Sequence, residues 1–158
     1  MNTRENKMDI GSKHGYPASA LSNFAPHPFV VEWRNFTLEC NSMEGFLQSL
    51  KFKNPNMQKH VATLVGYMAK KIGREKNWKF KGILWWNGEP IDRYSIDYQE
   101  LLDVAYNALV KNQSFLKALL ASKNAVLTHR MGKTSASETV LTQSEFCSRL
   151  MKIRANHS

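Results

Sequence analysis

The sequence has few cysteines, no clustered histidines and no long apolar run. Its two cysteines, Cys40 and Cys147, form neither a CxxC pair nor a zinc-type spacing, so we expect two reduced thiols. The five histidines show no metal-ligand pattern. No apolar stretch approaches the roughly 18 residues of a membrane span, and the opening MNTRENKMDI lacks the apolar core of a signal peptide. We therefore expect a cytoplasmic protein with no membrane partner, metal or cofactor.

Acidic residues are also scarce, at 13 against 22 basic ones, which gives a formal net charge of +9 and a pI of about 9.7. Such a surplus attracts polyanions and favours a nucleic-acid or nucleotide partner, although a basic surface can also serve solubility alone. The chain contains no GxSxG motif, no Gly-rich phosphate loop and no cysteine beside a histidine. Serine or cysteine nucleophiles and P-loop chemistry are therefore not supported.

The 158 residues fit one domain, which we place at residues 21–158 after a loosely ordered lead-in at 1–20. The stretch FVVEWRNFTLEC and the pair Asn87-Gly88 predict β-hairpins. Apolar spacing predicts helices over 41–53, 56–72, 96–112, 114–122 and 142–154, with caps at Asn41, Ser95 and Thr142 and a stop at Gly73. Strands do not alternate with helices, so no parallel sheet is expected. The predicted fold is mainly α, with one or two small β-hairpins.

Glu44 is the first candidate for chemistry. With Gln48 and Lys51 it occupies positions i, i+4 and i+7, which lie on one helix face opposite an apolar stripe. A carboxylate, an amide and an ammonium in one row suit a polar ligand. The alternative is structural, because Glu44 follows Asn41 by three residues and so fits a capping box.

A basic run follows the second helix, with only Glu75 opposing it. Its side chains can bind phosphate, or they can form a solvated surface. The late loop from His129 to Gly132 is a further phosphate candidate, although a lone loop histidine is more often structural. Aromatic rings can stack on bases, but most of them belong in a core. The basic run comprises Lys70, Lys71, Arg74, Lys76, Lys79 and Lys81.

An ordered series of short motifs resembles the YbiA-like family, also called NADAR, over about residues 21–154. The series is Leu21-Ser22-Asn23-Phe24-Ala25, Ser42-Met43-Glu44-Gly45-Phe46-Leu47-Gln48 with Lys51-Phe52, Ala69-Lys70-Lys71-Ile72-Gly73-Arg74, Tyr98-Gln99 with Leu101-Leu102, Ala118-Leu119-Leu120-Ala121-Ser122, Leu127-Thr128-His129 and Leu150-Met151-x-Ile153-Arg154. The resemblance implies a mainly helical fold and N-glycosidic cleavage. One branch of the family hydrolyses riboflavin-pathway intermediates, and another removes ADP-ribose from guanine in DNA.

By this resemblance Glu44 is the catalytic carboxylate. The substrate-binding residues it implies, together with those taken from the basic run, the aromatic residues and the late loop, are Ser22, Asn23, Phe24, Gln48, Lys51, Lys70, Gly73, Arg74, Trp86 and His129. The late loop THRMGKTSASETVLT departs from the family, since it has no aspartate before a Trp-Gly pair and contains only Glu138. The family tryptophan has no counterpart beside Asp97 and Tyr98, and we expect Trp85 or Trp86 to substitute for it, with Trp86 as the assigned binding residue.

The expected activity is hydrolysis of an N-glycosidic bond that removes ADP-ribose from guanine in DNA, with single-stranded DNA favoured because the base must leave the stack. This interpretation places the protein in reversal of DNA ADP-ribosylation, as an antitoxin or in phage defence. The +9 charge and the divergent late loop favour it over the riboflavin branch. Two alternatives stay open: cleavage of phosphoribosyl riboflavin intermediates, and a module that binds ADP-ribose or nucleic acid without turnover.

Overall fold

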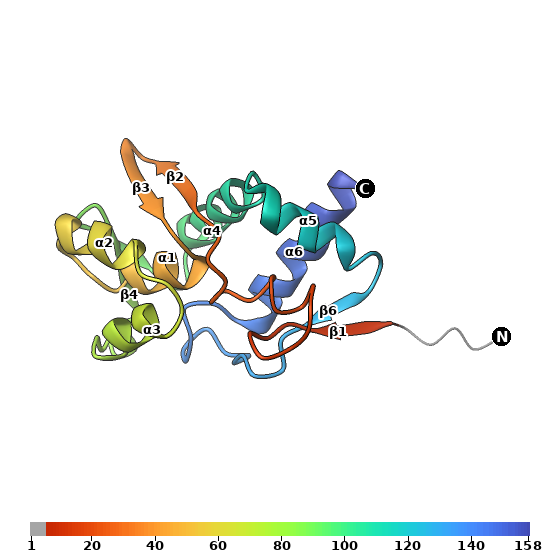
Figure 1. The fold of residues 1–158 in the computed structure, drawn as a ribbon. Coiled ribbons are helices and arrows are strands. Elements are labelled where there is room, and N and C mark those ends of the chain that lie inside the picture. Colours follow the sequence, from red (N-terminus) through yellow and green to blue (C-terminus); the bar gives the residue numbers. More distant parts are fainter. Residues whose placement is uncertain (1–5) are drawn as a thin grey trace.

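A computed structural model of the chain describes residues 6–158 (Figure 1). Helices dominate that part of the chain, and each sheet within it has two strands. The elements in chain order are β1 (Lys7–Asp9), β2 (Phe29–Trp33), β3 (Phe36–Cys40), α1 (Met43–Ser49), α2 (Pro55–Ala62), α3 (Tyr67–Arg74), β4 (Ile83–Trp86), β5 (Glu89–Asp92), α4 (Ile96–Leu109), α5 (Gln113–Ala121), β6 (Val126–Thr128) and α6 (Gln143–His157).

Both predicted β-hairpins are present. β2 pairs antiparallel with β3 around a turn at Arg34 and Asn35, whose φ angles are 49° and 60°. β4 pairs with β5 around Asn87 and Gly88, with φ angles of 50° and 82°. Two successive residues with positive φ give a tight turn whose twist matches that of the flanking strands. The buried face of the first hairpin packs against α4 and helps to enclose α1 in the centre of the molecule (Figure 1).

A parallel pair of strands was not expected from the sequence. β1 pairs in parallel with β6, which lies more than a hundred residues later, and the backbone N–H of Ile10 donates to Thr128 O at 2.8 Å. Ile10 is completely buried. The prediction of a loosely ordered lead-in is therefore wrong for residues 7–10, because a distant partner supplies the hydrogen bonds and the apolar contacts. Residues 1–5, also part of the predicted lead-in, lie outside the described residues.

The single helix predicted over 56–72 is two helices. α2 ends at Ala62, and α3 begins at Tyr67 after Gly66, whose φ of 59° breaks the helical path. Only glycine adopts that conformation at little cost. Gly73 does not stop a helix as predicted but lies inside α3, where it packs against α1. The break therefore re-aims α3 toward the helix that carries Glu44.

The predicted caps agree with the structure at two helices. The Ser95 hydroxyl accepts from the backbone N–H of Tyr98 at the start of α4, and Thr142 forms a capping box with Glu145 at the start of α6. Asn112 is not the end of α4, as predicted, but the N-cap of α5. Among residues 6–158, none of the helices has the length and apolar character needed to cross a bilayer.

Candidate active site

Glu44 is not a capping residue. The N-cap of α1 is Ser42, whose hydroxyl accepts from the backbone N–H of Gly45 at 3.0 Å, so Gly45 stands at N3 and Glu44 at N2. Asn41, the predicted cap, instead donates from Nδ2 to Thr63 O at 3.0 Å. The Glu44 carboxylate is half-buried and free of any capping contact. The structural alternative for Glu44 is therefore wrong.

Gln48 fixes the orientation of that carboxylate. Its Nε2 donates to Glu44 Oε1 at 2.8 Å, and its side chain is only 7% exposed. The other end of the amide, Oε1, is buried without a hydrogen-bond partner and lies against Gly73. A Cβ at residue 73 would lie 1.8 Å from this oxygen, far closer than van der Waals contact allows, so only glycine fits here without moving Gln48. Glycine at this position lets α3 approach α1 so closely that the amide is held toward Glu44.

Two lysines and a histidine lie close enough to Glu44 to act on its carboxylate. Lys51 is half-buried, and its Nζ lies 3.5 Å from Gly73 O. Burial lowers the pKa of the Lys51 ammonium to about 8, against the opposing charge of Glu44. Burial raises the pKa of the Glu44 carboxyl above its usual range, although the Gln48 hydrogen bond and the charges of Lys51, Lys70 and His129 oppose this rise. The carboxylate therefore gains a proton at a higher pH than a surface glutamate does.

The loop Ser22-Asn23-Phe24 is held against α1 by a backbone hydrogen bond. Asn23 O accepts from the backbone N–H of Glu44 at 2.9 Å, and the Ser22 hydroxyl accepts from the backbone N–H of Phe24 at 3.2 Å. Asn23 Oδ1 accepts from the hydroxyl of Tyr106, at 3.3 Å. Tyr106 is completely buried and its pKa is raised well above normal by burial, so it stays protonated and donates. Sequence reasoning missed Tyr106, although its spacing of four from Leu102 and three from Leu109 marks it as inward-facing.

Phe24 and Lys70 lie next to each other at the edge of this site. The Lys70 Nζ is 6.0 Å from the centre of the Phe24 ring, and a Cβ at residue 66 would lie 3.7 Å from that ring. Phe24 is half-buried. The structure therefore brings an ammonium and an aromatic ring together near Glu44, and their binding roles stay predictions.

The late loop contributes an imidazole and no carboxylate. The His129 Nδ1 donates to Ile10 O at 2.9 Å, and the ring packs edge-on against Phe146 at 5.3 Å. The second ring nitrogen, Nε2, is left to serve as donor or acceptor. Glu138 is exposed and pairs with Lys133 at 3.5 Å. His129 thus belongs to the surroundings of Glu44, while Glu138 is engaged elsewhere in its own loop.

Of the remaining predicted binding residues, Trp86 lies in the core and Arg74 lies on the outer surface. Trp86 is 2% exposed, and its Nε1 donates to Trp33 O at 2.9 Å in the aromatic core, so it offers no ring face to a ligand. Its assignment as a binding residue is wrong, because the alternation of β4 turns Trp86 inward and Trp85 outward. Arg74 is exposed at the end of α3 and donates to the Tyr67 hydroxyl at 3.2 Å. It lies on the outer surface, beside the site.

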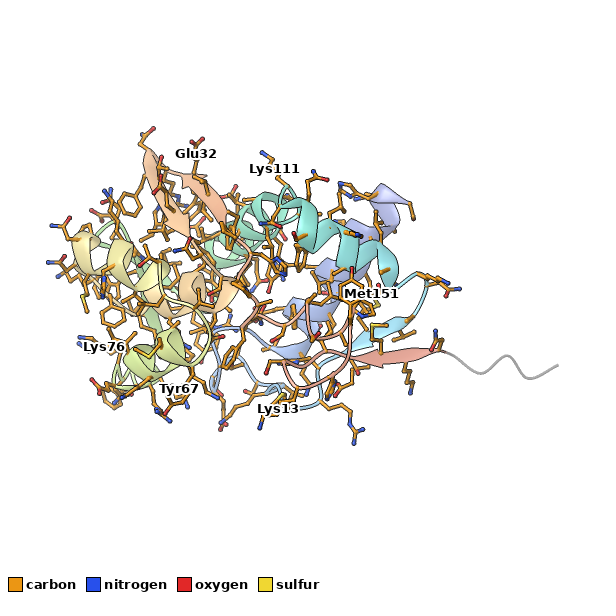
Figure 2. The ribbon with its side chains drawn as sticks, in the orientation of Figure 1. Lys13, Glu32, Tyr67, Lys76, Lys111 and Met151 are labelled. Carbon is orange, nitrogen blue, oxygen red and sulfur yellow. The ribbon has the colours of Figure 1, made fainter. Side chains whose placement is uncertain are left out.

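Glu44, Gln48 and Lys51 line neither of two cavities on the molecular surface. One of 590 Å³ lies between β2 and α4, at the edge from which Glu32 and Lys111 project (Figure 2). The other, of 280 Å³, adjoins the β4–β5 turn. A polar ligand bound by the Glu44–Gln48–Lys51 row needs a cleft beside it, and that cleft stays a prediction. In the described part of the chain, no group of three or more His, Cys, Asp and Glu side chains is placed to hold a metal ion.

The sequence matches the family described as Bacteriophage protein GP30.3 over residues 15–155. The chain belongs to this family. A relative in Enterobacteria phage T4, named as an uncharacterized 17.1 kDa protein in the Gp30-rIII intergenic region, is 38% identical over 151 residues, which cover 94% of this chain and 97% of the relative. The NMR structure of the E. coli protein YbiA has a similar fold, with a TM-score of 0.60 over 99% of this chain and 87% of YbiA, at 16% identity. The predicted YbiA-like fold is confirmed.

Proposed function

We propose that this phage-family protein hydrolyses an N-glycosidic bond, with Glu44 as the catalytic carboxylate. Breaking the bond between C1′ of a ribose and a nitrogen leaves positive charge on the sugar, as in glycoside hydrolysis. A carboxylate beside C1′ stabilises that charge or takes a proton from the attacking water, while the nitrogen leaves with the bonding electron pair and is protonated. The observation that carries this proposal is the half-buried Glu44, held by Gln48 and not used as a cap.

The substrate that fits these surroundings best is ADP-ribose linked to guanine in DNA. Lys51 and Lys70 lie on the same side of the molecule as Glu44 and provide positive charge for a diphosphate, and Arg74 stands beside them. The partly exposed Phe24, with Lys70 beside its ring, is the aromatic residue on which an adenine would stack. The +9 net charge favours a polyanion over a small metabolite, and a relative in phage T4 is consistent with a role against DNA modification.

The deciding experiment incubates the purified protein with an oligonucleotide that carries ADP-ribosyl-guanine and measures the release of free ADP-ribose. We expect release by the wild type and a loss of at least about 100-fold in kcat for Glu44→Gln, since the amide keeps the shape but not the charge. Glu32→Gln is the matched control, because Glu32 is exposed on the opposite edge of the molecule (Figure 2). Equal rates for the two variants contradict a catalytic role for Glu44.

Two other outcomes identify the alternatives. Faster cleavage of phosphoribosyl pyrimidine intermediates than of the modified oligonucleotide, measured as kcat/KM at one salt concentration, shows that the substrate is a small riboflavin-type metabolite. Tight binding of ADP-ribose with no turnover of either substrate shows a binding module.

A further inference from the structure

An exposed basic surface continues outward from the Glu44 site along α3 and the segment after it. Its cations form none of the ion pairs present within residues 6–158, and only Glu75 opposes them along the chain. Figure 2 shows Tyr67 and Lys76 projecting outward on this side. We call it the α3 basic surface, and it comprises the exposed residues Lys70, Lys71, Arg74, Lys76, Lys79 and Lys81.

Aromatic rings lie between these cations. Phe80 is 87% exposed, and Tyr67 and Tyr94 are each about 60% exposed. The Arg74 guanidinium lies 5.8 Å from the centre of the Tyr67 ring. A phenylalanine this exposed adds nothing to the core, so folding does not explain why an aromatic residue stands at position 80.

The backbone beneath these rings is well anchored. Trp78 is buried, and its carbonyl accepts from the backbone N–H of Gly82 at 2.9 Å. Gly82 in turn accepts from the backbone N–H of Arg93 at 2.8 Å, and the Tyr94 ring lies over Gly82. Phe80 and Tyr94 are therefore held on one short, fixed stretch of surface. Exposed rings on a rigid support lose little entropy when a flat group stacks on them.

This surface is joined to the candidate active site. The charge of Lys79 lies close enough to Lys51 to disfavour the Lys51 ammonium, and Lys51 lies beside Glu44. Lys76 also lies near this part of the chain, because its Nζ is 5.1 Å from the centre of the ring of Phe52, the residue after Lys51. The α3 basic surface thus adjoins Lys51 and Phe52, the residues that follow the helix carrying Glu44.

We propose that the α3 basic surface binds a single-stranded nucleic acid, with phosphates on Lys76 and Lys79 and a base stacked on Phe80. Bases in a strand expose their faces for stacking, whereas those in a duplex do not, and phosphates complement a surface that has one carboxylate among its cations. The strand enters the proposed function as the part of the substrate that flanks the modified guanine. Only that connection rests on the proposed function, because an unmodified strand binds by the same contacts.

The test is fluorescence anisotropy with a labelled, unmodified oligodeoxythymidylate of about 15 nucleotides. We expect Phe80→Leu to weaken binding about tenfold and Phe80→Tyr to retain it, since stacking is worth about 1–3 kcal/mol per base. The double variant Lys76→Ala/Lys79→Ala should reduce the slope of log K against log salt by about 1.4, at about 0.7 for each phosphate contact on a single strand. Lys111→Ala, exposed on the opposite edge (Figure 2), should leave both quantities unchanged.

Any of three results overturns this proposal. The first is that Phe80→Leu binds the strand as tightly as the wild type, and the second is that Lys111→Ala loses as much affinity as the variant of one lysine of the surface. The third is that polyglutamate displaces the labelled strand as well as an unlabelled strand of matched charge does. The last result identifies an acidic protein as the fitting partner. Strand binding with the expected variant effects but no release of ADP-ribose from a modified strand refutes the proposed function and leaves this surface established. Release of ADP-ribose from a modified strand, with no effect of Phe80→Leu on strand binding, refutes the role of this surface and leaves the proposed function established.

Discussion

The contact between Gly73 and Gln48 gives a sharp test of the site, through the variant Gly73→Ala. The new methyl would lie 1.8 Å from Gln48 Oε1 and 3.0 Å from Gln48 Cβ, so the whole side chain must move. Overpacking of this kind costs about 1–3 kcal/mol, while alanine in a helix interior returns about 1 kcal/mol relative to glycine. We expect a net loss of about 1 kcal/mol in the free energy of unfolding, measured by urea denaturation.

The functional effect should be larger than the structural one. When Gln48 moves, its 2.8 Å hydrogen bond to Glu44 is lost, and that bond lowers the pKa of the carboxyl. The pKa of Glu44 should therefore rise, which NMR titration of its side-chain carboxyl measures directly and independently of any activity. In the proposed reaction, the acidic limb of kcat/KM shifts to higher pH.

Two further variants separate the clash at Gln48 from a general effect of replacing glycine by alanine. Gly15→Ala places a methyl where no atom lies within 4 Å, so it should change neither the stability nor the titration. Gly73→Ala combined with Gln48→Ala removes the clash with the amide and leaves only the 3.0 Å contact with the Cβ of residue 48. This double variant should recover part of the stability, while the pKa of Glu44 stays raised because the hydrogen bond from Gln48 is absent. If Gly73→Ala alone is as stable as the wild type and Glu44 titrates normally in it, Gly73 does not position Gln48 and the reasoning is refuted.

Two further predictions concern pH and stability. The rate of the proposed reaction should follow a bell-shaped curve against pH, because Glu44 must lose a proton, which it does above the usual pH range of a glutamate, and Lys51 loses its charge near pH 8. Lys51→Arg should remove the decline in rate at high pH. If that decline is unchanged in the variant, Lys51 is not its origin. Glu145→Gln should cost about 3–5 kcal/mol in thermal or urea unfolding, because it leaves Arg93, which is 1% exposed, without its counter-charge at 2.6 Å. Although burial opposes it, hydrogen bonds from Arg93, Gln99 and Thr142 hold the pKa of Glu145 below its ordinary 4.5. The folded state thus gains stability above pH 4.5 and loses it as the pH falls through the lowered pKa, a loss that Glu145→Gln should not show.

Elements specified by neighbouring residues could be predicted from the sequence. The turn at Asn87-Gly88 needs two positive φ angles, and asparagine and glycine accept them at low cost. The capping box of Thr142 and Glu145 needs residues three positions apart. The Glu44–Gln48 contact follows in the same way from a spacing of four along one helix. In each case the partners lie within a few residues of each other.

Features that depend on distant partners could not be predicted in this way. β1 is three residues long and gains its hydrogen bonds from β6, at the other end of the chain, so no local pattern marks it. Gly66 divides α2 from α3 because its φ is positive, whereas the apolar spacing on either side runs on as if the helix were continuous. The placement of Trp86, by contrast, follows from period-two alternation in β4, where Leu84 and Trp86 point inward together. The prediction for Trp86 failed because it rested on the family resemblance and not on the alternation of buried and exposed residues along β4.

The charges around Glu44 argue for a ligand more strongly than any single residue does. Lys51, Lys70 and His129 influence the carboxylate from three separate segments, yet within residues 6–158 Glu44 makes no ion pair at 4.0 Å or less. A carboxylate kept only for stability would gain most by closing onto the nearest ammonium, as Glu145 does with Arg93. Spacing the charges apart instead keeps both signs available to a substrate. It suits a molecule that develops positive charge at C1′ beside the carboxylate and carries phosphates beside the cations.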